Sequence, residues 1–401
     1  MLSDIQQRWL CCLDAAGDRA DHAPRHTTRN PLHCIVPPHI HGAILLNSNN
    51  PQHRARALRS LNLSTSFLSA RIGNDEAARQ AREIVRGRRA ELGRPAWQLA
   101  GTGNLERTIY SSHNTQQLPG NQVRREGEPP TGDAAVDEAY TYMGSTFDFY
   151  WNVYGRNSVD DAGAPLIGSV HFERDYDNAF WNGSQMIYGD GDGVEFTRFT
   201  VSPDVIGHEL THGVTQNESN LVYWKQAGAL NESISDVFGS MVKQYYYNQN
   251  VTQADWLIGY GLFIPGSTKP GLNGVVAIRS LAAPGTAYGY PVPDPILGTD
   301  PQPATMSQYV DTFQDNGGVH INSGIPNRAF YLTASNLGGY AWEKAGLIWY
   351  QTCLDGRLRR IAQFRDFARL TVSVTQYLFP GVNTPELNAV RYGWSSVGIN
   401  V

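Results

Sequence analysis

The sequence has few cysteines and no long hydrophobic run. Of four cysteines among 401 residues, Cys11, Cys12 and Cys34 lie near the N-terminus, which leaves Cys353 alone in the rest of the chain. Disulfide bonds are therefore not expected to support the main part of the fold. The first 30 residues contain no continuous apolar segment, and we expect neither an ordinary signal peptide nor a transmembrane helix.

Lysine is missing from the first 95 residues, which carry 14 arginines against eight acidic side chains. The remaining residues carry 18 basic and 29 acidic side chains, so the two parts have opposite net charge. This asymmetry favours an intramolecular partnership between a basic leader, residues 1–95, and the acidic remainder. An arginine-rich segment can also bind nucleic acid or an anionic membrane, but no nucleic-acid-binding module is present and we expect no such partner.

Residues 208–212 read His-Glu-Leu-Thr-His. On a helix, residues four apart share one face, so His208 and His212 can bind one metal ion while Glu209 stays outside the ligand set. A third ligand is expected from Glu232, at the start of a helical pattern over residues 226–247. The set predicts one catalytic zinc ion and a zinc-bound water from which Glu209 removes a proton.

Two further residues near Glu232 can orient the histidines. Asp236, one helical turn after Glu232, is placed to hold the second ring nitrogen of one ligand histidine, and Asn231 can do the same for the other. The five-residue histidine motif alone arises by chance in roughly one chain of this length in a hundred. The downstream acidic residues make the chance interpretation much weaker.

The same region resembles the thermolysin family of zinc metalloproteases. The resemblance covers most of residues 105–401 and rests on the segments NAFWNG at 178–183, YGDGDG at 188–193 and DNGGVHINSG at 315–324, besides HELTH and NESISD. It implies an α+β, two-lobed fold with the zinc helix in the cleft. Residues 96–206 are expected to form a strand-rich lobe and residues 207–401 a mainly helical lobe.

The resemblance also implies roles for six residues outside the metal site. It implies that His320 donates to the oxyanion with Asp315 orienting it, that Tyr223 is a second donor, that Arg279 binds a substrate carbonyl, and that Asn178 and Ala179 pair with an extended peptide. The last pairing would use main-chain hydrogen bonds and give little sequence preference. Other interpretations stay open, since Tyr223 can be a half-buried aromatic and Arg279 a structural arginine.

Substrate preference is expected from one apolar pocket. By position relative to the zinc helix, its lining residues are Phe196, Phe199, Val205 and Ile278. They imply a preference for a large apolar residue directly after the scissile bond. Each of the four can equally be ordinary core.

The sequence departs from the family at its double calcium site. Asp204 and Asp255 remain, but Lys243, Leu257 and Tyr260 stand at the other matching positions. Calcium is possible by resemblance, yet the charge needed for two divalent ions is gone. We expect Lys243 to bridge Asp204 and Asp255 instead.

The leader resembles the short propeptide of the protealysin-like subgroup, which implies a zymogen. Cys34 is followed by Ile-Val-Pro-Pro-His-Ile and then by a helical pattern over residues 52–87. Pro37 and Pro38 predict a stiff, extended segment laid across the substrate groove. Cys34 can then bind zinc as a thiolate, or it can be a small buried apolar residue, and His33, His39 or His41 can replace it as ligand. Removal of the leader is expected within residues 86–95.

Together these observations predict a zinc-dependent neutral endopeptidase that is made as a zymogen and cuts on the amino side of large apolar residues. The alternatives are a zinc-containing peptide-binding protein without catalysis, an aminopeptidase, and another type of zinc peptidase. We expect a monomer whose partners are peptide substrates and its own leader. The resemblance implies action outside the cell, with cytoplasmic storage of the precursor as the alternative.

Overall fold

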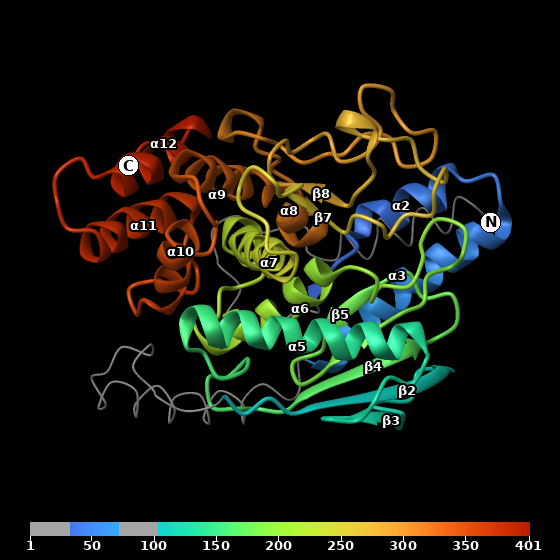
Figure 1. Ribbon diagram of the computed structural model, residues 1–401. Helices are drawn as coiled ribbons and strands as arrows, with labels where there is room; N and C mark the ends of the chain where they lie inside the picture. The colour runs from blue at the N-terminus through green and yellow to red at the C-terminus, as the bar shows by residue number, and fades with distance from the viewer. Residues whose placement is uncertain (1–32, 72–102) are drawn as a thin grey trace.

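The computed structural model describes residues 33–71 and 103–401 (Figure 1). The expected cleavage segment 86–95, Cys11 and Cys12 lie outside these ranges, as does the second half of the helix expected over 52–87. The described part has a sheet with a long helix on one side and a mainly helical lobe above it (Figure 1). This is the two-lobed α+β architecture that the sequence predicts.

A six-stranded mixed sheet forms the first lobe, in the order β1-β5-β6-β4-β2-β3. The strands are β1 His33–Cys34, β2 Arg107–Thr115, β3 Asn121–Arg125, β4 Leu166–Phe172, β5 Ala179–Trp181 and β6 Met186–Tyr188. Strand β4 runs parallel to β2 and β6, whereas β1 pairs antiparallel with β5. The leader therefore contributes the strand at one edge of this sheet.

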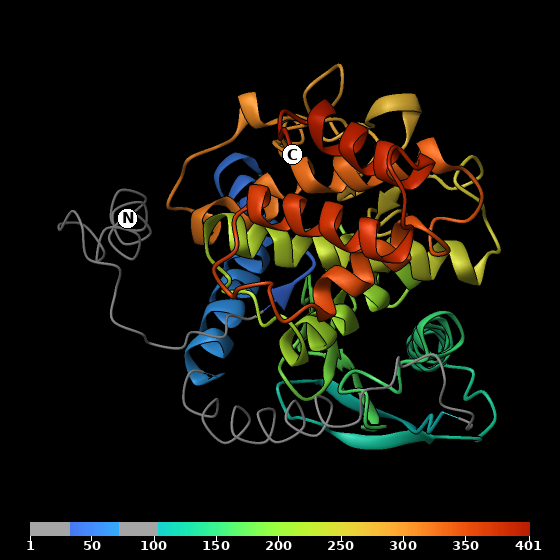
Figure 2. The same cartoon turned by 90° about the vertical axis from the view of Figure 1, so that its left-hand side faces the viewer.

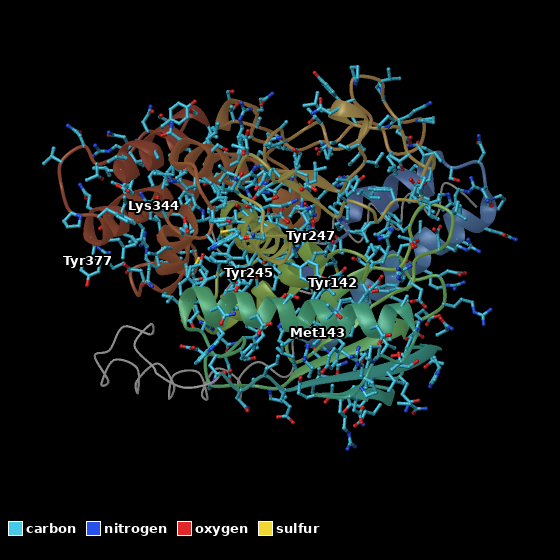
Figure 3. The ribbon with its side chains drawn as sticks, viewed as in Figure 1. Tyr142, Met143, Tyr245, Tyr247, Lys344 and Tyr377 are labelled. Atoms are coloured by element: carbon cyan, nitrogen blue, oxygen red, sulfur yellow. The ribbon has the colours of Figure 1, made fainter. Side chains whose placement is uncertain are left out.

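Helix α5, Ala134–Tyr154, runs along the sheet (Figure 1). The Asp133 side chain caps its first turn by accepting the N–H groups of Ala135 and Val136, and Gly155 ends it in the left-handed conformation. An aromatic cluster connects α5 to residues 245–247, where the rings of Tyr142 and Tyr246 pack edge to face with their centroids 5.3 Å apart. Figure 3 labels Tyr142 beside Tyr245 and Tyr247. The cluster packs the two lobes together behind the cleft.

The second lobe is built on two helices, α6 Pro203–Asn217 and α7 Lys225–Tyr246, which pack directly against each other. Around them lie α8 Asp315–Asn322, α9 Gly324–Leu337, α10 Ala345–Leu354, α11 Phe364–Leu378 and α12 Pro385–Ser396, and the small sheet of β7 Leu257–Ile258 and β8 Arg279–Ser280. The expected lobe boundary between residues 206 and 207 falls inside α6. The metal-binding motif thus sits on a helix that begins at the junction of the lobes.

Close approach of α6 and α7 requires a glycine at position 239. A Cβ atom there would lie 2.5 Å from the carbonyl oxygen of Asp204 and 2.9 Å from the backbone nitrogen of His208. Both are backbone atoms of α6, which cannot move aside as a flexible side chain can. Gly239 therefore fixes the distance between the helix that carries the two histidines and the helix that carries Glu232.

The described leader residues form two helices, α2 Pro38–Asn47 and α3 Pro51–Arg71. In Figure 2 these helices run along one side of the molecule, from the helical lobe towards the sheet. The expectation that both prolines continue an extended segment is corrected, because only Pro37 is extended and Pro38 starts α2. Proline is well accommodated at a first helical position, where its missing N–H would have no partner within the helix.

Gly239→Ala should destabilise the protein by about 1–3 kcal/mol, because the added methyl group overpacks the α6–α7 contact. Chemical denaturation of the full chain measures this change. Gly356→Ala is the matched control, since its Cβ would meet nothing within 4 Å and should shift stability by less than about 0.5 kcal/mol. Equal stability of the two variants would contradict the role given to Gly239.

Candidate active site

Helix α6 presents His208 and His212 on one buried face, as their spacing predicts. The Nδ1 atom of His208 lies 2.8 Å from Oδ1 of Asp236, and the Nδ1 atom of His212 lies 2.9 Å from Oδ1 of Asn231. Both partners are on α7 and both are the residues expected from the sequence. Because each Nδ1 is held in this way, the Nε2 atoms of the two rings face each other at 3.0 Å.

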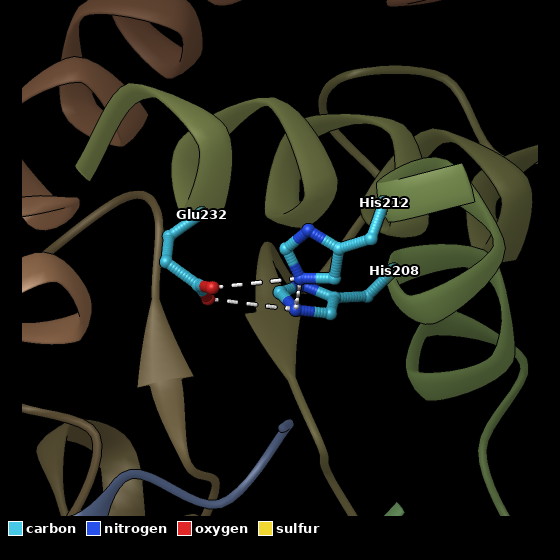
Figure 4. Close-up of side chains that lie close together, drawn as sticks. All are labelled: His208, His212 and Glu232. Atoms are coloured by element: carbon cyan, nitrogen blue, oxygen red, sulfur yellow. Dashed lines mark hydrogen bonds and ion pairs between the residues drawn. The ribbon is translucent and has the colours of Figure 1, made fainter. Parts of the chain in front are cut away.

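Glu232 completes a three-residue group from the adjacent helix. Its carboxylate oxygens lie 3.5 Å from Nε2 of His208 and 3.4 Å from Nε2 of His212 (Figure 4). The three candidate ligand atoms lie within 4.8 Å of one another, and all three residues are buried. Two imidazoles and one carboxylate are the donor set of a catalytic zinc site with an open position.

The hydrogen bonding of this three-residue group also fits a bound metal ion. Within the described part of the chain, Oε2 of Glu232 is buried and accepts no hydrogen bond. A buried carboxylate oxygen without a partner is costly, and a cation at this point would remove the cost. These observations support a zinc ion held by His208, His212 and Glu232.

Glu209 lies beside the ligand group, and its carboxylate is hydrogen-bonded to strand β5. Its Oε2 accepts the backbone N–H of Trp181 on β5 at 3.0 Å, whereas its Oε1 has no hydrogen-bond partner among the described residues. Burial, and next the charge of Glu232, raise the pKa of Glu209 well above its usual value. A bound Zn²⁺ acts in the opposite direction because its charge favours the carboxylate. One oxygen of Glu209 is thus anchored and the other is available to a water molecule.

A second group of polar side chains lies beside Glu232. Asp315 accepts a hydrogen bond from Nδ1 of His320 at 2.5 Å, and Nε2 of His320 lies 3.1 Å from the hydroxyl of Tyr223. Burial opposes protonation, but the charges of Asp315 and Glu232 raise the pKa of His320 to about 9. The hydroxyl of Tyr223 donates to Glu232. His320 and Tyr223 therefore place two donors next to the metal ligands.

The leader crosses this site in an extended conformation. Ile35 donates its N–H to the carbonyl oxygen of Ala179 at 3.2 Å, and Val36 donates to Oδ1 of Asn178 at 3.0 Å. The side-chain amide of Asn178 returns a bond to the carbonyl of Val36 at 3.4 Å. The strand edge predicted to pair with a peptide is therefore paired with the leader.

Two consecutive leader carbonyls contact predicted catalytic-site residues. Nη1 of Arg279 donates to the carbonyl of Ile35 at 3.0 Å, and Nε2 of His320 donates to the carbonyl of Cys34 at 3.1 Å. Arg279 itself is buried and is held by two hydrogen bonds of 2.8 Å to the carboxylate of Asp236. The arginine and the metal-ligand histidine His208 thus share one orienting carboxylate.

The residues expected to line the apolar pocket are all buried. Ile35 belongs to the same core cluster as these four residues, Phe196, Phe199, Val205 and Ile278. Ile35 is fully buried, so its side chain is enclosed by the hydrophobic core to which the four predicted lining residues also belong.

Cys34 lies in a different apolar cluster. Its side chain is buried with Leu63, Phe172 and Phe180, where the leader helix α3 meets the sheet. The three-residue ligand group found among the described residues does not include its sulfur. The side chain of Cys34 is therefore buried with apolar neighbours, and its carbonyl group contacts His320.

Four contributors to the site were not predicted from the sequence. Trp181 supplies the N–H that binds Glu209, Ser235 lies 3.0 Å from Nδ1 of His212, Asn327 donates to Asp236 at 2.8 Å, and Gln302 donates to the carbonyl of His320 at 2.8 Å. They come from four separate elements and share no motif. Of the four, only Ser235 could have been predicted from the sequence, because it lies one helical turn after Asn231 and beside Asp236.

Lys243 occupies the position where the family resemblance had suggested calcium. Its ammonium lies 2.7 Å from Oδ2 of Asp204, 2.9 Å from Oδ1 of Asp255 and 2.6 Å from the carbonyl of Leu257. Burial alone would lower its pKa, but the two carboxylates raise it. Tyr260 is about half exposed nearby in sequence. The bridge is the one expected from the sequence.

Comparison with known proteins supports this geometry. Residues 94–216 match the family described as the thermolysin metallopeptidase catalytic domain, and residues 219–399 match the thermolysin metallopeptidase alpha-helical domain. The fold and the ligand group define a two-lobed zinc metallopeptidase. The chain belongs to the thermolysin metallopeptidase family.

Individual relatives agree with this assignment. The chain is 54% identical over 299 residues to an extracellular metalloprotease of Pectobacterium carotovorum subsp. carotovorum, covering 75% of this chain and 82% of the relative. It is 38% identical over 368 residues to the extracellular minor metalloprotease of Serratia marcescens, covering 91% and 94%. The solved precursor of protealysin from Serratia proteamaculans is 46% identical, with a TM-score of 0.77 and coverage of 92% and 99%.

The chain is therefore a zinc-dependent metalloendopeptidase of protealysin-like type that acts on peptide substrates. The similarity to the protealysin precursor covers 92% of this chain, which is more than the region matched by the two family models and so includes part of the leader. In the described ranges, no helix is both long and apolar enough to span a bilayer.

Lys243→Ala should lower the free energy of unfolding by about 3 kcal/mol, because it leaves the buried Asp204 without a counter-charge. Lys225→Ala is the matched control, since Lys225 pairs with Asp311, both side chains are exposed, and the pair should contribute less than about 1 kcal/mol. Both are measured by denaturant unfolding with and without added calcium. An unchanged midpoint for Lys243→Ala would show that the bridge is not structural.

Proposed function

We propose that the protein is a latent endopeptidase that cleaves on the amino side of large apolar residues, with Glu209 as general base. The observation that carries this proposal is the leader itself. It lies across the ligand group as an added strand on β5, and its main-chain groups bond to Ala179, Asn178, Arg279 and His320. A substrate that uses the same contacts would place one peptide carbonyl beside the metal ligands.

In this proposal, two consecutive carbonyls of the substrate have separate roles. The position of the Cys34 carbonyl, 3.1 Å from Nε2 of His320, is that of the carbonyl under attack. The next carbonyl is held by Arg279 at 3.0 Å, which fixes the register of the peptide. Fixing two consecutive carbonyls prevents the chain from sliding and holds the reacting atoms in place.

Proton transfer falls to Glu209. When it is bound by His208, His212 and Glu232, zinc acts as a Lewis acid that polarises the substrate carbonyl and lowers the pKa of a water molecule. Oε1 of Glu209 takes a proton from the attacking water while Oε2 stays on the N–H of Trp181, and the carboxylic acid then delivers the proton to the leaving nitrogen. His320 and Tyr223 donate to the oxygen that becomes negative.

Preference for an apolar residue follows from the pocket. In the leader, the residue directly after the carbonyl bound by His320 is Ile35, and its side chain is fully buried in the hydrophobic core to which Phe199, Val205 and Ile278 also belong. A polar side chain there would lose its water without gaining a hydrogen bond. Large apolar side chains are therefore the expected residues after the scissile bond.

Latency follows from occupancy of the groove. The described leader buries the substrate edge and is held by contacts with both lobes, which a free peptide must displace. We infer that the enzyme acts as a monomer, since a single copy of the chain supplies the candidate ligand group, the proposed base and the leader strand that fills the groove. We also infer that it acts outside the cell, because the named relatives from Pectobacterium and Serratia are extracellular metalloproteases.

The test is hydrolysis of an internally quenched peptide that has one large apolar residue after the expected scissile bond and no lysine or arginine. The leader is first cut by trypsin at its arginines, and trypsin is then inhibited. Glu209→Ala should lose activity by about 10²-fold to 10⁴-fold. Chelation should abolish the wild-type activity and added zinc should restore it.

The control is Glu343→Ala, a substitution of an exposed glutamate that should keep full activity. A protein that binds zinc and the peptide but never cleaves it would instead be a peptide-binding protein without catalysis. Release of single N-terminal residues from unblocked peptides, with blocked peptides left intact, would identify an aminopeptidase.

A further inference from the structure

The bond between Cys34 and Ile35 lies in the position of a scissile bond. Its carbonyl oxygen is the one that contacts His320, and its nitrogen is the one that donates to Ala179 at 3.2 Å. The carbonyl after it is bound by Arg279. The site thus contacts both sides of this single bond, through the His320 side chain on the carbonyl and the Ala179 main chain on the nitrogen.

The direction of the leader is that of a substrate. Strand β1 runs antiparallel to β5, with Cys34 opposite Phe180, and Val36 makes a two-way contact with Asn178. A segment in the reverse direction would place a nitrogen where the attacked carbonyl belongs. The orientation therefore offers no protection against hydrolysis, in contrast to an inhibitor segment that binds backwards.

We propose that the enzyme hydrolyses its own Cys34–Ile35 bond and that the clipped leader, beginning at Ile35, stays in the groove and keeps the enzyme latent. The proposal rests on the proposed function, since it needs Glu209 to act as the base. It adds an internal processing site that is separate from the expected removal of the leader within residues 86–95.

The reaction is a simple hydrolysis. The water oxygen bonds to the carbonyl carbon of Cys34, and the bond from that carbon to the nitrogen of Ile35 breaks. Both water protons end on the nitrogen, the first through Glu209. The products are a carboxylate on Cys34 and an ammonium group on Ile35, with no oxidant or other reactant needed.

The part of the leader after the cut has its own anchors. Nδ2 of Asn47 donates to the carbonyl of Ile296 at 2.7 Å, in the helical lobe. Arg56 lies 3.2 Å from Asp175 and donates to the carbonyl of Asp192 at 3.0 Å, in the strand-rich lobe. Residues 35–71, which follow the cut bond in the chain, are therefore held by contacts with both lobes. One hydrolysed bond does not release them.

Retention also explains how a substrate-like segment can inhibit. The anchors hold the Ile35 amino group at the site, so product release is slow and the groove stays filled. Activity towards other peptides then depends on a second cut that frees residues 35–71 as a whole.

The experiment uses the zinc-loaded full chain, followed by intact mass and N-terminal sequencing. Wild type should accumulate a chain that begins at Ile35 while its activity on the quenched peptide stays at the latent level. Glu209→Ala should remain uncut. The rate of this cut should not change on dilution, because the bond and the base belong to one molecule.

Ile35→Asp tests the pocket, since it places a charge among apolar residues, and should abolish the cut. Leu46→Asp is the matched control, because Leu46 is an exposed leader residue on α2 and its variant should still be cut. After removal of the leader, both variants should show wild-type activity on the quenched peptide, which verifies that the catalytic part has folded.

Two outcomes would overturn the proposal in distinguishable ways. An enzyme that cleaves the quenched peptide after leader removal but never yields a chain beginning at Ile35 would overturn the self-cleavage and leave the proposed function intact. An enzyme that cleaves neither the peptide nor itself would overturn both. Full activity as soon as the Ile35 end appears would overturn the retention of the clipped leader.

Discussion

The close contact between α6 and α7 is the constraint on which the site depends. Helix α6 carries two candidate metal ligands and the proposed base, Glu209, and helix α7 carries the third candidate ligand and the residues that hold both histidines. Because Gly239 lets the two backbones meet, all three ligand atoms fit within 4.8 Å of one another. The other parts of the site lie around this pair. Strand β5 pairs with the peptide segment, and α8 carries His320, the proposed oxyanion donor.

The sequence predicted this central pair well because its information is local. His208 and His212 lie one turn apart on a helix with Glu209 directly after His208, and Asn231, Glu232 and Asp236 lie on another, so spacing alone defines which side chains share a face. The roles of His320 and Arg279 depended on family resemblance, since they lie far from the motif along the chain.

Other features could not be read from the sequence because they depend on how distant elements meet. Nothing near Trp181 marks its N–H as the partner of Glu209, and nothing near Asn327 marks it as the partner of Asp236. Pro38 was misplaced for a different reason: proline fits both an extended segment and the first turn of a helix, so local preference does not choose between them. In the structure α2 lies on the helical lobe, where Nε2 of His39 is 3.2 Å from the hydroxyl of Tyr288 and Asn47 donates to the carbonyl of Ile296.

The ammonium of Lys243 has a consequence that is thermodynamic rather than geometric. A dissociable ion stabilises a fold by an amount that grows with its free concentration, so its contribution vanishes on dilution or chelation. The counter-charge beside Asp204 is covalently attached and enters at fixed stoichiometry, at 2.7 Å. The contribution of the Lys243–Asp204 pair to the folding equilibrium therefore does not depend on the concentration of any dissolved cation.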